Sequence, residues 1–131
     1  MAVTHSATAA KAMTDASVDL IDGGTGAAQG SVVFMTSGDV DVATCDFSTP
    51  PAYGAGTSAA PSVATANAIS DDTSAAGGTV AKFKHVDRDG TGHHFGTVTV
   101  TGGGGDYTIS SVTIAPGETV SVTSSTYTGP S

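Results

Sequence analysis

From residue 30 onward, the chain is punctuated in a way that restricts it to a β fold. Short runs rich in Val, Thr, Ile, Phe and Tyr alternate with clusters of Gly, Asp, Ser and Pro, which is typical of strands joined by turns. Near the end of the chain, Val120 and Val122 alternate with Thr and Ser, which predicts a strand with one buried face. We expect strands at 31–36, 40–47, 63–69, 79–87, 93–101, 106–114 and 119–127. About seven short antiparallel strands favour a β-sandwich.

One α-helix is predicted before these strands, over residues 6–21. Thr4 and Ser6 are suitable N-caps, and the pair Gly23–Gly24 would end the helix. Its apolar residues recur at spacings of three and four and form a weak stripe: Ala9, Ala12, Met13, Ala16 and Leu20. Small side chains in this stripe would let the helix lie close to a sheet or to a neighbouring subunit. We expect this helix to depend on tertiary or quaternary contacts.

The length and composition indicate one domain, 1–131, with a thin core. We divide it into an N-terminal arm and helix at 2–21 and a sandwich at 30–128, which carries a long Pro- and Gly-rich loop at 48–62. The sequence holds one Leu and no Trp, so Val, four Phe and three Tyr must build the interior. Thin cores are often supplemented by oligomerisation or by a partner surface. This composition favours a component of an assembly.

The charge of the chain argues against several classes of partner. The formal net charge is −8, and Lys11, Lys82, Lys84 and Arg88 are the four cationic side chains besides histidine. So few cations cannot neutralise a run of phosphates, and an anionic membrane would repel the chain. No apolar stretch approaches the length of a bilayer span, and the start of the chain lacks the pattern of a signal peptide. We expect a soluble, unprocessed protein that binds neither nucleic acid nor membrane.

Several motifs suggest chemistry, and each has a structural alternative that we favour. The segment 87–90 resembles the first half of an EF-hand loop, but Val98 stands where the bidentate Glu would be, and Asp-Gly is a common hairpin turn. His93 and His94 are adjacent in a predicted strand and would point to opposite faces, so they are expected to be surface or edge-strand residues rather than zinc ligands. Asp71–Asp72 fits a polar turn, and Cys45 fits a buried apolar position.

These motifs do not combine into an active site. No Gly-x-Ser-x-Gly elbow occurs, and the few aromatic side chains argue against the cleft of a glycosidase. We therefore expect a non-enzymatic protein with no metal or other cofactor.

Across nearly its whole length, the sequence resembles a family of small tailed-bacteriophage proteins encoded near the major capsid gene, known as head decoration, cement or head-fibre proteins. The likeness begins with MAVTHS at 1–6 and includes PAYGA at 51–55 and GGTVAKF at 77–83. It also covers residues 14–15, 18–20, 22–24, 36–39, 42–44, 64–69 and 87–90. His93–His94 and the four glycines at 102–105 depart from the family pattern.

The resemblance implies a β-sandwich, with a jelly roll as one form of it, that docks on the outside of the phage head and ties major capsid subunits together. Its partner would be the major capsid protein, and binding near symmetry axes would favour a homodimer or homotrimer. The chain would be made in the host bacterial cytoplasm and would reside on the capsid surface of the virion. The family offers no catalytic residues.

The interface is expected in the two segments with the least self-sufficient apolar pattern, the N-terminal segment and the loop 48–62. The candidate contact residues are Val3, Thr4, His5, Met13, Leu20, Pro50, Pro51 and Tyr53. Two other hypotheses remain open: an outward-facing adhesive or head-fibre module that binds a host surface or glycan, and a tail component of the virion.

Overall fold

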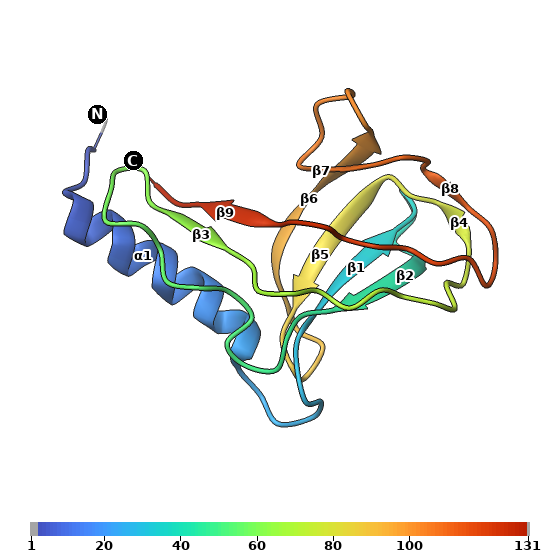
Figure 1. Cartoon of the computed structure of the whole chain (residues 1–131), viewed down its shortest axis with the longest axis horizontal. Coiled ribbons are helices and arrows are strands. Elements are labelled where there is room, and N and C mark those ends of the chain that lie inside the picture. Colours follow the sequence, from blue (N-terminus) through green and yellow to red (C-terminus); the bar gives the residue numbers. More distant parts are fainter. Residues whose placement is uncertain (1–2, 131) are drawn as a thin grey trace.

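The computed structural model of the chain describes residues 3–130, and its regular elements are mainly strands, with one α-helix (Figure 1). Helix α1 spans Ala7–Asp19 and continues into a 3-10 turn, η1, at Leu20–Asp22. The strands are β1 (Ser31–Met35), β2 (Asp41–Asp46), β3 (Val63–Thr65), β4 (Gly78–Thr79), β5 (Lys82–Val86), β6 (Gly92–Val100), β7 (Tyr107–Ile109), β8 (Thr113–Ile114) and β9 (Thr126–Thr128).

Helix α1 lies at one end of the molecule and packs against the pair formed by β3 and β9 (Figure 1). Ser6 caps its N-terminus, where the hydroxyl oxygen accepts a hydrogen bond of 3.1 Å from the backbone N–H of Ala9. The helix buries Ala10, Thr14 and Val18, which recur every four residues. The predicted helix and its cap at Ser6 are therefore confirmed.

The main sheet has five strands in the order β2-β1-β5-β6-β7 and curls into a half-barrel. Its first four strands pair in antiparallel fashion, whereas β7 lies parallel to β6. The glycine-rich connection 101–106 joins these two parallel strands, and Gly102 and Gly104 adopt positive φ angles there that other residues rarely adopt. The sheet therefore ends at β7, whose outer edge is not covered by another strand of the described chain.

Two small two-stranded sheets complete the fold. β3 pairs with β9, and β4 pairs with β8, both in antiparallel fashion. The concave side of the half-barrel holds the core, where Phe34 and Phe83 both pack edge-on against the ring of Tyr107, with ring centroids 5.8 Å and 4.5 Å apart. Phe47 and Tyr53 extend this core toward the helix.

This architecture differs from the expected sandwich of seven antiparallel strands. The described residues form nine strands in three sheets, and one strand pair is parallel. The reason lies partly in the last expected strand, 119–127, where Val120 is buried and Val122 half-buried as predicted, but regular pairing is limited to an isolated bridge at Val120 and to β9. The alternation of side chains predicted the buried face, but it carried no information on which strand would lie beside it.

Candidate functional site

Helix α1 has a second apolar face, which points away from the rest of the protein. The apolar stripe consists of Ala9, Ala12, Met13, Ala16 and Leu20, and we call it the outer stripe. Three residues of the stripe each follow a buried residue by two positions, which turns their side chains about 200° around the helix axis. They are Ala12, Ala16 and Leu20, and the buried residues are Ala10, Thr14 and Val18. These three residues of the stripe are exposed, and Ala9 and Met13 are half-buried. Ala12, Ala16 and Leu20 therefore leave an apolar strip of the helix exposed in the described chain.

The residues expected at an interface in the N-terminal segment lie near this stripe. Val3 and Leu20 expose 60% and 50% of their surface, and Thr4 is also exposed. His5 and Met13 are half-buried. The structure thus places these five residues in or beside the exposed part of α1.

The loop 48–62 is tied to α1 instead of extending away from it. The carboxylate of Asp15 accepts a hydrogen bond of 2.6 Å from the backbone N–H of Gly56, and that of Asp22 accepts one of 2.9 Å from Ala52. Pro50 and Pro51 are exposed, whereas Tyr53 is only 4% exposed and packs in the core. The prolines of this loop are therefore available to a partner, and Tyr53 belongs to the interior.

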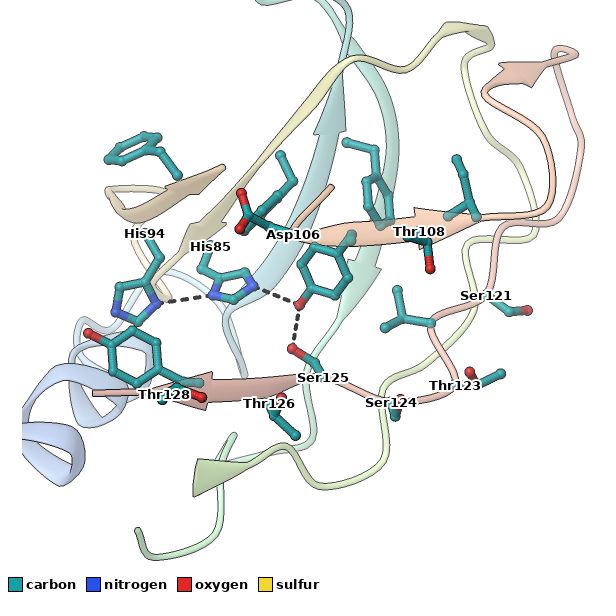
Figure 2. Close-up of a pocket in the computed structure, with 17 residues that line it drawn as sticks. His85, His94, Asp106, Thr108, Ser121, Thr123, Ser124, Ser125, Thr126 and Thr128 are labelled. Carbon is teal, nitrogen blue, oxygen red and sulfur yellow. Dashed lines mark hydrogen bonds between the residues drawn. The ribbon is translucent and has the colours of Figure 1, made fainter. Parts of the chain in front are cut away.

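A groove runs between β7 and the C-terminal segment 119–128. Its larger part has a volume of about 570 Å³ and its smaller part about 400 Å³. Thr108, Ile109, Ser121 and Thr123 line both parts, so the two are continuous. Figure 2 shows β7 on one side of the larger part and the labelled residues from Ser121 to Thr128 on the other. We call this feature the β7 groove.

A chain of hydrogen-bonded side chains forms the floor of the larger part (Figure 2). Its successive members are Ser17, His94, His85, Tyr107, Ser125 and Tyr53. The two Nδ1 atoms of His94 and His85 lie 3.1 Å apart, and Nε2 of His85 lies 2.8 Å from the hydroxyl of Tyr107. Helix α1, three strands of the half-barrel and the C-terminal segment are connected through these contacts.

The bonding pattern links the tautomers of the two histidines, because one must donate from Nδ1 and the other must accept there. In one direction, Tyr107 donates to Nε2 of His85, and His85 donates from Nδ1 to His94. In the opposite direction, His94 donates from Nδ1 to His85, and His85 donates from Nε2 to Tyr107. In both directions each imidazole carries one proton and is neutral.

Burial keeps the side chains of this hydrogen-bonded row neutral. It lowers the pKa of His85 to about 3, with a further contribution from the neighbouring His94, whose own pKa is lowered mainly by burial. Burial likewise raises the pKa of Tyr53 and of Tyr107. These side chains are neutral, and each is hydrogen-bonded to the next. Their role is structural, and none of them is an activated nucleophile.

Sequence reasoning missed this chain of polar residues. We expected His93 and His94 at the surface or on an edge strand, but both are half-buried on β6, an interior strand of the sheet, and their neighbour His85 is 4% exposed. The signal was present, because His85 shares its parity in β5 with buried Phe83. The expectation that His93 and His94 face opposite ways is confirmed, since His93 bonds Asp87 at 2.8 Å while His94 faces His85.

The other motifs have the structural roles predicted for them. The segment 87–90 forms the turn between β5 and β6, and Asp87 accepts hydrogen bonds from the backbone of Asp89 and Thr91. Asp72 accepts bonds from the backbone of Ser74 and Thr44, and Cys45 is fully buried, with its thiol pKa raised by desolvation.

Within residues 3–130, no group of three or more His, Cys, Asp or Glu side chains is placed to hold a metal ion. The part of the chain that the structure describes also has no helix long and apolar enough to cross a bilayer. Comparison with known proteins found no family model, no curated protein and no solved structure that matches this chain.

Proposed function

We propose that this protein decorates the capsid of a tailed bacteriophage and stabilises contacts between major capsid subunits. The observation that carries the proposal is the outer stripe of α1. An amphipathic helix of a self-contained domain buries its apolar face on its own core, yet α1 has apolar residues on both faces. A face of small apolar residues allows close approach of another surface. The resemblance of the sequence to head decoration proteins is our reason for proposing the phage capsid as that surface.

The neighbouring residues are consistent with such a docking face. Val3, Thr4, Pro50 and Pro51 add exposed small or apolar surface to the stripe and to the adjoining loop. A protein that binds only the assembled shell adds its binding free energy to the stability of that shell. Decoration would therefore raise the heat resistance of the capsid without any catalytic step.

Co-sedimentation with capsids that lack the protein tests this proposal. The native chain should bind saturably and raise the temperature at which the capsids open. The double variant Ala12→Glu/Ala16→Glu places two charges on the outer stripe and should reduce binding at least tenfold, because desolvating unpaired carboxylates is costly. Both positions are exposed, so the free protein should keep its circular-dichroism spectrum.

A matched control is Ala7→Glu, which adds a charge to an exposed position of the same helix, three residues before buried Ala10 and so on the face opposite the stripe. This variant should bind as the native chain does. Absence of binding by the native chain to an intact capsid preparation would remove the decoration role, and equal binding by the double variant would remove the stripe from the interface.

A further inference from the structure

We propose that the β7 groove receives an extended basic polypeptide segment from a partner, which adds as a strand between β7 and residues 121–124. This function goes beyond capsid decoration and does not depend on it. The proposal comes from backbone groups that the fold leaves unpaired, from the charges around them and from the shape of the opening.

One wall of the groove is an unpaired stretch of backbone. Ser121, Val122, Thr123 and Ser124 make no hydrogen bond, through backbone or side chain, to any other described residue. The chain is anchored on both sides of this stretch, by the bridge from Val120 to Asp72 and by the bond from the N–H of Ala66 to the carbonyl of Ser125. Residues 121–124 are thus held in place with free donors and acceptors.

The opposite wall is the outer edge of the half-barrel. β7 bonds to β6 on one side, and no backbone hydrogen bond joins its other side to the described part of the chain. A side-chain contact, from the hydroxyl of Tyr107 to Ser125, spans the two walls instead (Figure 2). Two facing edges without a strand between them are a template for strand addition, in which the main chain of the guest supplies the affinity.

The charges around the groove favour a basic guest. Asp106 and Glu118 are the acidic residues that line it, and neither has a Lys or Arg partner among the described residues. Both carboxylates are exposed, and Asp106 lines the larger part while Glu118 lines the smaller one. A guest with Lys or Arg at both ends would meet a carboxylate in each part.

The groove also offers apolar contacts to alternate side chains of the guest. Half-buried Ile109 and Val122 lie in it, and Phe95 exposes 69% of its surface at the larger part. Side chains of an extended strand alternate between the groove and the solvent, so small β-branched residues such as Val and Thr suit the interior positions.

The direct test uses a panel of acetylated, amidated hexapeptides with Lys at both ends and Ser, Thr or Val at the four interior positions. Binding is followed by NMR, together with hydrogen exchange of the amides of residues 121–124. We expect saturable binding and at least tenfold slower exchange of these amides. A panel with Glu at both ends should bind at least tenfold more weakly, and N-methylated peptides should not bind, because methylation removes backbone donors.

Thr123→Pro should abolish binding without unfolding the protein, since the N–H that it removes makes no internal hydrogen bond. Ser58→Pro, at an exposed position of the loop 48–62, is the matched control and should bind normally. If Thr123→Pro does not fold, the comparison of N-methylated and unmodified peptides on the native chain gives the same answer.

The proposal would be overturned if no member of the Lys panel binds at millimolar concentration, or if N-methylation leaves binding unchanged. It would also be overturned if the amides of residues 121–124 become protected from exchange when only the protein concentration is raised. The last result would assign the groove to a second copy of this chain. All of these outcomes are independent of whether the protein binds capsids.

Discussion

Buried His85 couples the stability of the fold to pH. The ordinary pKa of histidine is about 6.5, and burial holds that of His85 at about 3 in the folded protein. Below pH 6.5, the unfolded chain therefore takes up a proton that the folded chain does not. The contribution of His85 is fully present above pH 6.5 and is lost as the pH falls toward 3. The slope is about 1.4 kcal/mol per pH unit for this one group.

His85→Gln should remove this part of the pH dependence. Between pH 4 and 6, the free energy of unfolding of the variant should fall less steeply than that of the native chain, by about 1.4 kcal/mol per pH unit. Urea titrations at several pH values measure the difference. Tyr53→Phe is the control, since it removes a hydroxyl from the same chain of residues but no histidine. Parallel slopes for His85→Gln and the native chain would contradict the account.

The hydroxyl of Tyr107 is expected to contribute directly to stability. It lies between Nε2 of His85 and Oγ of Ser125, so Tyr107→Phe leaves Nε2 of buried His85 without its hydrogen-bond partner. The expected loss is about 2 kcal/mol of unfolding free energy. Tyr127→Phe is the matched control, because the Tyr127 hydroxyl bonds to none of the described residues, and its cost should stay below about 0.5 kcal/mol. Equal effects of the two variants would show that the chain of hydrogen bonds contributes nothing.

Among the elements, helix α1 is the one whose stability most affects the proposed docking face. Ser6→Ala removes the cap from its N-terminus and should lower the free energy of unfolding by about 1 kcal/mol. Thr8→Ala, two residues further on at an exposed position, should have little effect. Thermal unfolding followed by circular dichroism distinguishes the two variants. A Ser6→Ala protein as stable as the native one would mean that the cap is not used.

The secondary structure could be predicted from local signals, and the pairing of strands could not. The cap at Ser6, the stop near Gly23 and the alternation at Val120 and Val122 are local properties, and the structure reproduces them. The parallel pairing of β6 and β7 depends on how the glycine connection folds, which neighbouring residues do not determine.

The candidate site shows the same division. The stripe on α1 was visible from its spacing, but the side of the helix that would be buried was not, because Ala10 and Thr14 are too small or too polar to indicate a core. Burial of His85 was accessible from its parity with Phe83 in β5. Its partners come from other strands and could only be found in the folded chain.

At the scale of the whole molecule, the account expects self-association. The core contains few large side chains, while Phe95, Val100 and Leu20 are exposed. A thin core of this kind is often supplemented by oligomerisation. Light scattering at micromolar concentration should give a mass of two or three chains. A monomer mass at every concentration up to the millimolar range would contradict this expectation and would leave the capsid as the partner of these surfaces.

The central claim is that the outer stripe of α1 lies at the interface with the capsid. Cys45 is buried and its thiol pKa is raised, so a fluorophore attaches selectively to an added surface cysteine. The label should be placed at Ala16→Cys in the stripe or at exposed Thr113→Cys in β8, at the other end of the molecule (Figure 1), and its accessibility to a soluble quencher measured before and after capsids are added. The account predicts that saturating capsids shield the label at position 16 and leave the one at position 113 accessible. Saturable binding with both labels equally accessible would contradict it.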